Sequence, residues 1–357
     1  MPPNLKPVLA GYPPGDLTEL LAPLPAYRSR QIFSWISRGV SSFAEMTDLP
    51  QNLRADLDAQ FSLYSGVVSA RLQDDDGTEK LQITLEDDCR IEAVLLRDGR
   101  DRLTACLSTQ AGCPMGCVFC KTGALGFRRN LTSSEIVEQF LRLKNKPGDV
   151  REIANIVIMG MGEPLLNLAE LRRAIAVFTA PEGLGLSRRR ITVSTSGIAS
   201  GIRDLADTGC GVRLALSLTT ADAELRERLM PVTRTNPLPD LQKALHYYQA
   251  RENHRITLEM VLLGGINTRV RDADALAVFM RGLDAVVNLI PWNPVDGMCF
   301  EGKPLREPGS RELEGFMTEL EKRGIKATRR YRKGRNIGGA CGQLGDVISA
   351  PATRGWR

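Results

Sequence analysis

Residues 111–123 read Ala111-Gly-Cys113-Pro-Met-Gly-Cys117-Val-Phe-Cys120-Lys-Thr-Gly123, a short run with three cysteines in the spacing C-x3-C-x2-C. Thiolates are soft ligands that suit iron–sulfur clusters and zinc. A structural zinc site needs four ligands, usually two pairs from separate places. After this run the next cysteine is Cys210, and the two histidines are His246 and His254. The spacing therefore favours a four-iron cluster with one open iron over zinc with a remote ligand or three unrelated buried thiols.

The same spacing is the signature of radical S-adenosylmethionine (SAM) enzymes, and this loop resembles theirs. The resemblance implies that Cys113, Cys117 and Cys120 hold a 4Fe–4S cluster, whose open iron binds SAM through its amino and carboxylate groups. One electron then cleaves SAM to a 5′-deoxyadenosyl radical. An electron donor for the cluster is therefore an expected partner.

The composition is that of an ordinary globular protein: 357 residues, 43% apolar and 25% charged, with a net charge of +5. This length allows one large domain and a smaller one. The first residues lack the basic-then-apolar pattern of a signal peptide, and no apolar run approaches the ~20 residues that span a membrane. Eight cysteines without a secretion signal favour a reducing compartment, so we expect a cytoplasmic protein with no membrane partner.

Three compact basic tracts stand out: Arg128-Arg129, Arg188-Arg189-Arg190 and the run from Arg329 to Arg335. Such tracts are often solvated surface. Three of them in one chain can also line a face that binds phosphate groups, as in proteins that bind nucleic acids.

Hydrophobic periodicity divides the chain into four parts. Residues 1–65 are predicted to form a small helical domain, with a helix over Arg28–Arg38 and a break at Pro50. Apolar residues then alternate with a period of two within residues 66–101. Asp76-Gly77 has the form of a hairpin turn, which predicts a short antiparallel β appendage. Residues 102–345 form the main domain, and residues 346–357 form a C-terminal tail.

The main domain alternates strand-like and helix-like runs. Six apolar runs predict strands, at Leu103–Leu107, Ile153–Met159, Ile191–Ser194, Val212–Leu218, Ile256–Leu262 and Val286–Ile290. Helical patterns follow them, one opened by the capping box Thr132-Ser-Ser-Glu135 and others at about 165–179, 198–208, 238–253 and 270–284. Such alternation indicates parallel pairing with right-handed crossovers. The predicted α/β fold is a partial or complete parallel (β/α)6 barrel with its site at the carboxyl ends of the strands.

Polar residues and glycines follow the predicted strands. The second strand leads into Met159-Gly-Met-Gly162-Glu163-Pro164, where glycines permit close approach to a ligand and Glu163 can accept hydrogen bonds from an ammonium or a ribose hydroxyl. Ser194, Ser217 and Asn293 follow the third, fourth and sixth strands. Their side chains can hold ribose or carboxylate oxygens, with helix capping and a turn role as the alternatives.

Two further cysteines require comment. Cys341 lies in the glycine-rich stretch Asn336-Ile-Gly-Gly-Ala-Cys341-Gly-Gln-Leu344, and an accessible thiol of this kind is a candidate for chemistry. Cys106 lies within the first strand and is structural by default. No pattern surrounds the remaining cysteines, Cys89, Cys210 and Cys299, and we assign them no role.

Taken together, these motifs resemble the RlmN/Cfr family of radical SAM RNA methyltransferases over nearly the whole chain. The matching segments are Cys106–Cys120, Gly126–Thr132, Met159–Asn167, Ser194–Gly197, Asn288–Pro294 and Ala340–Leu344. Tyr27–Ile32 and Met46–Pro50 resemble the family's accessory RNA-binding domain. The form Gly162-Glu-Pro-Leu-Leu-Asn167 is closer to the RlmN branch, which methylates adenine at C2.

The resemblance implies a role for each matching residue. Cys341 would carry the methyl group, with Cys106 as its resolving partner. Glu92 matches the proton acceptor proposed for the family, and an exposed surface glutamate is the alternative there. The residues expected to contact SAM are Gly162, Glu163, Ser194, Ser217, Leu218, Thr219 and Asn293.

The implied activity is methylation of adenine C2 in 23S ribosomal RNA, with transfer RNA open as a second substrate. Adenine C2 is too electron-poor to attack a sulfonium methyl group, but a carbon radical can add to it. Two SAM molecules would serve each turnover, one methylating Cys341 and one supplying the radical that takes a hydrogen from this methyl group. The methylene radical would add to the base, forming a transient protein–RNA adduct. Loss of the C2 proton and attack by Cys106 would release the RNA and leave a disulfide that a reducing cytoplasm can reset.

Two alternatives remain open: methylation at adenine C8, as in the Cfr branch, and a non-catalytic iron–sulfur RNA-binding protein. The sequence departs from the usual family pattern at three positions. Thr219 replaces a histidine, Lys121 replaces a small residue beside the cluster, and Asn336 stands where aspartate is common. These departures bear on cofactor position, cluster potential and substrate choice. We expect a monomer.

Overall fold

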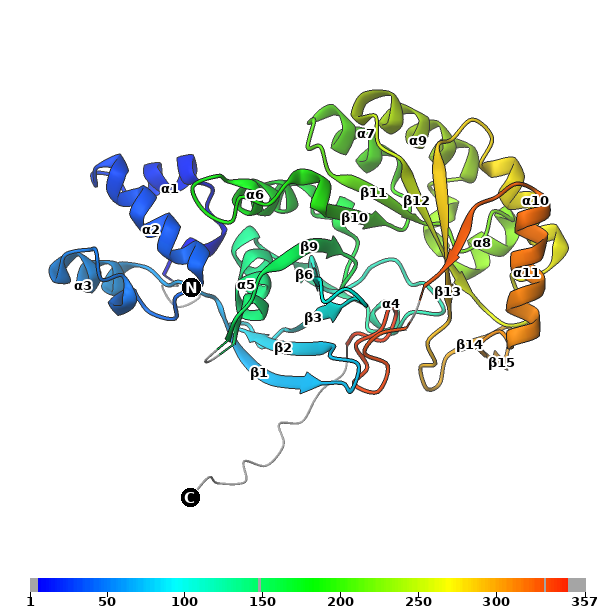
Figure 1. Ribbon diagram of the computed structural model, residues 1–357, viewed down its shortest axis with the longest axis horizontal. Coiled ribbons are helices and arrows are strands. Elements are labelled where there is room, and N and C mark those ends of the chain that lie inside the picture. The colour runs from blue at the N-terminus through cyan, green and yellow to red at the C-terminus, as the bar shows by residue number, and fades with distance from the viewer. Residues whose placement is uncertain (1–5, 147–148, 331, 346–357) are drawn as a thin grey trace, which may run out of the picture.

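The computed structural model describes residues 6–146, 149–330 and 332–345. In these residues ten strands form one sheet, in the order β1-β2-β3-β4-β9-β10-β11-β12-β13-β16 (Figure 1). The strands of this sheet are β1 (Gly66–Gln73), β2 (Glu79–Leu85), β3 (Arg90–Arg97), β4 (Leu103–Cys106), β9 (Ile153–Ile158), β10 (Ile191–Thr195), β11 (Arg213–Ser217), β12 (Ile256–Leu262), β13 (Ala285–Pro291) and β16 (Ala327–Arg329). The predicted tail, residues 346–357, lies outside the described residues.

A helical module precedes the sheet and lies beside it in Figure 1. It contains α1 (Pro14–Leu20), α2 (Ala26–Arg38) and α3 (Gln51–Gln60). The apolar face of α2 buries Ile32, Phe33 and Ile36, and Pro50 precedes the first residue of α3. The predicted helix over Arg28–Arg38 and the break at Pro50 are therefore confirmed.

The sheet begins with an antiparallel region. β1, β2 and β3 pair antiparallel in chain order, with Asp76-Gly77 in the turn between β1 and β2. β3 also pairs antiparallel with β4, whereas β4 pairs parallel with β9. The predicted appendage is therefore an extension of the main sheet, because β3 occupies the edge that β4 would otherwise leave unpaired.

The rest of the sheet is parallel. β4 and β9 to β13 match the six predicted strands, and each pairs parallel with its neighbour. This confirms the predicted α/β fold with parallel strands. A seventh parallel strand, β16, follows β13 at the far edge. Within the described residues the strand order ends at β1 and β16, so the barrel is partial.

Helices connect the parallel strands. The larger helices are α5 (Ser133–Lys144), α6 (Leu168–Thr179), α7 (Ala199–Asp207), α8 (Ala223–Leu229), α9 (Leu238–Glu252), α10 (Val270–Phe279) and α11 (Ser310–Lys322). The larger helices other than α8 share one apolar core with the strands, whereas α8 packs in a second apolar cluster with the cysteine loop. The capping box predicted for α5 is present, because Thr132 Oγ1 accepts from Glu135 N at 3.2 Å. Among the described residues, no helix combines the length and apolar character needed to cross a membrane.

The short elements complete the description. They are α4 (Lys121–Ala124), the hairpin of β5 (Gln110–Gly112) and β6 (Phe127–Asn130), the pair β7 (Asn145–Lys146) and β8 (Asp149–Val150), and the pair β14 (Cys299–Phe300) and β15 (Lys303–Pro304). The cysteine motif lies between β5 and α4, so the β5–β6 hairpin forms the base of its loop.

Candidate active site

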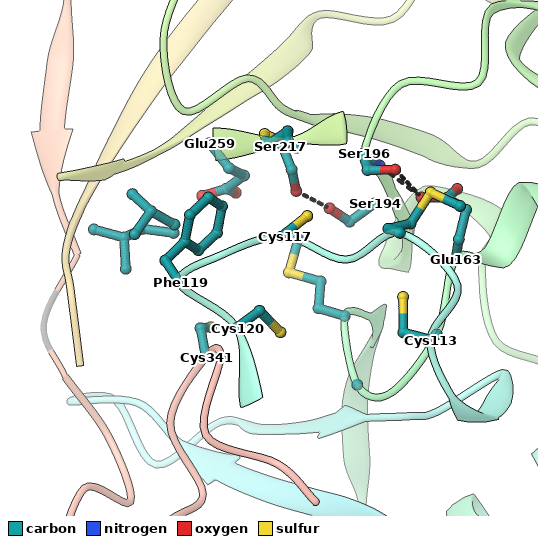
Figure 2. Close-up of a pocket in the computed structure, with 18 of the residues that line it drawn as sticks. Cys113, Cys117, Phe119, Cys120, Glu163, Ser194, Ser196, Ser217, Glu259 and Cys341 are labelled. Carbon is teal, nitrogen blue, oxygen red and sulfur yellow. Dashed lines mark hydrogen bonds between the residues drawn. The ribbon is translucent and has the colours of Figure 1, made fainter. Parts of the chain in front are cut away.

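A cavity lies at the carboxyl ends of the parallel strands (Figure 2). The cysteine loop forms one side, the carboxyl-terminal parts of β9 to β13 and the residues after them form the floor and the opposite side, and Cys341 and Gly342 complete the lining. Nine predicted site residues line this cavity: Cys113, Cys117, Cys120, Gly162, Glu163, Ser194, Ser217, Asn293 and Cys341. Motifs that are far apart in the sequence therefore meet at one place, as expected for a parallel sheet.

The three motif thiols belong to a tightly wrapped loop. Gly112 has a φ of +77°, and a Cβ there would overlap the carbonyl oxygen of Gly126, so this turn requires glycine. Burial raises the pKa of Cys113 to about 12, and it also raises the pKa of Cys117 and of Cys120. Buried thiols become thiolate ligands when a strongly positive metal centre faces them. Three soft sulfur donors around one cavity fit a 4Fe–4S cluster with one open iron.

Glu163 is held rigidly in the cavity wall. Its carboxylate accepts hydrogen bonds from Thr195 Oγ1 at 2.7 Å, from Leu165 N at 3.1 Å, and from both the backbone N and the Oγ of Ser196 at 2.7 Å. Burial raises the pKa of Glu163. This carboxylate joins the end of β9 to the end of β10, and its edge toward the cavity can receive the ammonium group of a ligand.

The other predicted polar residues offer hydrogen-bonding atoms to the same cavity. Ser194 Oγ lies 3.4 Å from Ser217 Oγ, so the two hydroxyls share one hydrogen bond (Figure 2). Asn293 Nδ2 donates to the backbone oxygen of Cys341 at 3.0 Å. Its Oδ1 is buried and has no hydrogen-bond partner among the described residues. An orphaned acceptor in a cavity wall fits a site that receives a polar ligand.

Leu218 and Thr219 lie behind the cavity wall. Both side chains are fully buried, and neither is among the described residues that line the cavity. Leu218 N donates to Glu259 O at 2.9 Å, and the backbone oxygen of Thr219 accepts from Asn267 Nδ2 at 2.9 Å. These two residues therefore connect β11 to its surroundings through backbone atoms.

Cys106 and Cys341 meet in a second cavity that adjoins the first. Both cysteines line it, and Met159, Asn293 and Arg330 line both cavities. Burial and, to a smaller extent, the neighbouring Cys341 raise the pKa of Cys106 to about 12, and Arg330 opposes the shift. Figure 2 shows Cys341 beside Cys120 of the cysteine loop. Cys341 lines both cavities, so it contacts the cavity of the cysteine loop and also the cavity that contains Cys106.

Glu92 is a buried residue of β3, so the exposed surface glutamate considered above is wrong. Its side chain is 1% exposed, forms an ion pair with Lys80 at 3.1 Å and accepts from Gly345 N at 2.6 Å. Glu92 lines neither of the two cavities described above, within the described residues. It lines a third pocket, on the side of the β5–β6 hairpin.

For two arginines of the site, the sequence did not predict the position that the structure shows. Arg226 is fully buried, and its guanidinium donates to the backbone oxygens of Ser196, Ser217 and Leu218, which fixes the ends of β10 and β11. An arginine in a charged helix such as α8 gives no signal of burial. Arg330 lies in a tract predicted to be either solvated surface or phosphate-binding, and the structure places it in the wall of the cavity that Cys106 and Cys341 line.

Comparison with known proteins agrees with this geometry. The sequence model of the Radical SAM superfamily matches residues 107–276, and that of the ribosomal RNA large subunit methyltransferase N-terminal domain matches residues 15–63. The crystal structure of a radical SAM methyltransferase from Sphaerobacter thermophilus is 40% identical and superposes with a TM-score of 0.88, covering 94% of this chain and 98% of its own. The cysteine loop, the partial barrel and the cavity together define a radical SAM enzyme.

Two curated relatives narrow the family. A protein from Treponema denticola is 49% identical over 344 residues, which cover 96% of this chain and 97% of the relative. One from Thermus thermophilus is 41% identical over 354 residues, covering 98% and 96%. Both are called probable dual-specificity RNA methyltransferase RlmN. The chain belongs to the RlmN family; it is a radical SAM RNA methyltransferase whose cofactors are a 4Fe–4S cluster and SAM.

Proposed function

We propose that this enzyme methylates C2 of adenine in 23S ribosomal RNA and in transfer RNA. The observation that carries the proposal is the shared cavity of Cys106 and Cys341, directly beside the cavity of the cysteine loop. Two neighbouring thiols beside the cofactor cavity suit a reaction in which one sulfur carries a one-carbon group and the other sulfur releases it. The relatives named RlmN, with the dual specificity in their names, support the choice of RNA substrates.

The cofactor site uses the residues that line the first cavity. Cys113, Cys117 and Cys120 hold the cluster, and the two cofactors supply the methyl group and the 5′-deoxyadenosyl radical. The SAM-binding set comprises Gly162, Glu163, Ser194, Ser217, Leu218, Thr219 and Asn293. Leu218 and Thr219 take part through their backbone, since their side chains lie behind the wall.

The chemistry on the protein then runs through two thiols and one carboxylate. The Cys341 thiol loses its proton and takes a methyl group; removal of one hydrogen atom leaves a methylene radical that adds to adenine C2. Glu92, which holds the segment of Cys341 through Gly345 N, takes the C2 proton, and the unpaired electron left on the adduct passes to the enzyme's electron-transfer partner. The Cys106 thiolate attacks the Cys341 sulfur and breaks its bond to carbon. The released carbon takes a proton and becomes the methyl group of the RNA, and the disulfide that forms is reduced by a cellular dithiol.

Basic side chains beside the second cavity suit the phosphates of the RNA. Arg330, Arg332 and Lys333 line this cavity with the two thiols. Phosphate contacts of this kind weaken with salt, and the target base would be flipped into the opening. We further propose that the enzyme works as a monomer in the reducing cytoplasm and takes electrons from a separate donor protein.

The test is mass spectrometry of RNA from cells with and without this enzyme. 2-Methyladenosine that disappears with the gene and returns with the wild-type copy supports the proposal, whereas 8-methyladenosine would assign the C8 reaction. The absence of both methylated nucleosides would favour the non-catalytic iron–sulfur RNA-binding protein considered in the sequence analysis. Anaerobic incubation with SAM and a reductant would then yield no 5′-deoxyadenosine above the level without enzyme.

A further inference from the structure

The segment that carries the methyl-accepting thiol, residues 334–345, is held at its start by the antiparallel region of the sheet. We call these residues the thiol segment. Gly334 N donates to Asp76 Oδ2 at 2.9 Å. Asn336 donates through its backbone N and its Nδ2 to the carboxylate of Asp74, at 3.1 and 2.9 Å. Both aspartates lie between β1 and β2, so this turn closes on the first residues of the segment.

A buried ion pair holds the rest of the thiol segment. Lys80 Nζ lies 3.1 Å from Glu92 Oε1, and both side chains are 1% exposed. Lys80 Nζ also donates to Gly338 O at 3.2 Å, and Gly345 N donates to Glu92 Oε2 at 2.6 Å. The pair therefore contacts the segment on both sides of Cys341.

The cysteine loop holds the same segment from the parallel side. Lys121 N donates to Gly342 O at 2.8 Å, and Thr122 Oγ1 donates to Leu344 O at 2.7 Å. The thiol segment thus bridges the two regions of the sheet. Its anchors on the antiparallel side are charged side chains, whereas these contacts to the cysteine loop are made by a backbone amide and a hydroxyl.

We propose that Lys80, Asp74 and Asn336 are positioning residues that set the place of the Cys341 sulfur. The proposal rests on the function given above, in which this sulfur meets a methyl donor, the base and Cys106 in turn. A buried ion pair adds little net stability, because desolvation offsets the attraction. Its value here is geometric, since a misplacement of about 1 Å in a reacting group slows a reaction by about 100-fold.

The Asp74–Asn336 contact allows a test in which the donor and the acceptor exchange sides; Asp74 is buried, and Asn336 is exposed. Asn336→Asp restores the residue that is common in the family but keeps Asp74 opposite it, so two carboxylates meet and the amide donor is lost. We expect methyl transfer to Cys341 in a single turnover to slow by about tenfold. We also expect amide hydrogen exchange within residues 334–345 to speed up, while iron content stays that of the wild type.

The double variant Asp74→Asn with Asn336→Asp restores a donor and an acceptor with their sides exchanged. We expect this double variant to recover most of the lost rate of methyl transfer to Cys341 and most of the lost protection of residues 334–345 from hydrogen exchange. Equal losses in the single and the double variant would contradict a positioning role for this contact.

Lys80→Met tests the buried pair, with Arg71→Met as its matched control. Arg71 pairs with Glu79 at 3.0 Å on the same hairpin, and Lys80 and Arg71 are on opposite faces of the sheet according to the strand register. We expect Lys80→Met to slow methyl transfer by about 10-fold to 100-fold. In addition, 5′-deoxyadenosine should form in excess of methylated RNA, because the thiol is no longer in place. Arg71→Met should keep the wild-type ratio of these products.

The readouts separate this inference from the proposed function. If the wild-type enzyme never carries a methyl group on Cys341, the proposed function fails, yet hydrogen exchange of the thiol segment still reports on the anchors. If wild-type Cys341 is methylated but exchange and transfer rate are unchanged in Lys80→Met and Asn336→Asp, the positioning role is wrong.

Discussion

The parallel and antiparallel regions of the single sheet divide the work of the site between them. The parallel strands end in the loops that line the cofactor cavity, whereas the antiparallel strands hold the thiol segment. β4 belongs to both regions. Its last residue, Cys106, is paired with Val94 on the antiparallel side and with Val157 on the parallel side. The thiol proposed to resolve the adduct therefore lies at the boundary where the two regions meet.

The two regions also differ in how they fix their functional groups. On the parallel side, Glu163 and Arg226 are tied to hydroxyls and backbone groups at strand ends. On the antiparallel side, Asp74, Lys80 and Glu92 use charge to hold a segment close to the end of the described chain. The strand ends are therefore fixed by neutral and backbone groups of the parallel strands, whereas the thiol segment depends on charged side chains of the antiparallel strands for its position.

The largest effect is expected from Cys341→Ala, which removes the thiol of the antiparallel side and leaves the parallel side intact. RNA methylation should fall below detection, a loss of at least about 1,000-fold, because no other residue can carry the methyl group. Iron and sulfide content should stay at the wild-type level. Methylated RNA at a wild-type rate from this variant would show that the thiol segment carries no reacting group.

Cys106→Ala changes the boundary residue and should give a different result. The base can still be attached to Cys341, but nothing attacks the sulfur to release it. We expect a protein–RNA adduct that survives denaturing electrophoresis, and repeated turnover lower by at least about 100-fold. Nuclease digestion followed by mass spectrometry should place the modified adenosine on Cys341. Normal turnover without an adduct would contradict the role of Cys106.

The pKa of Cys106 predicts how adduct release depends on pH. Burial raises this pKa to about 12, above the ordinary value of a thiol. The thiolate is the attacking species, so at neutral pH only a small fraction is reactive, and this fraction grows about tenfold with each pH unit. Release measured in single turnovers between about pH 7 and 9 should therefore speed up by about tenfold per unit. A rate that is flat over this range would mean that the thiol is already deprotonated.

The sequence predicted the parallel region better than the antiparallel one, for physical reasons. Apolar strands that alternate with helices leave a strong pattern, and the cysteine spacing and the glycine-rich turns mark the strand ends of the site. The sequence did not predict β16 or α8, because a short strand and a short charged helix carry little periodicity. The burial of Lys80 and Glu92 was equally invisible, since charged residues on a hairpin usually face solvent. Both side chains contact the thiol segment, which lies more than 250 residues away in the sequence, so periodicity carries no information about this contact.

The smallest effect is expected on stability, from a substitution of Thr219. At this position the chain departs from the usual histidine of the family. Thr219 has a φ of +61°, which is strained for a β-branched residue and better tolerated by histidine or glycine. Its buried hydroxyl has no hydrogen-bond partner among the described residues. Thr219→Gly removes the backbone strain and the unpartnered buried hydroxyl, but it also increases the entropy of the unfolded chain. The net result should be a free energy of unfolding that is higher by about 1 kcal/mol.

The neighbouring Thr220 provides the control for this prediction. Its Oγ1 accepts from Asp222 N at 3.2 Å, just before α8, and its φ is not positive. Thr220→Gly should therefore destabilise the protein by about 1 kcal/mol or more, because it removes this hydrogen bond and adds chain entropy. The midpoints of thermal and denaturant unfolding should rise for Thr219→Gly and fall for Thr220→Gly. A shift in the same direction would mean that the backbone at Thr219 stores no strain, and that the parallel region accepts threonine there at no cost.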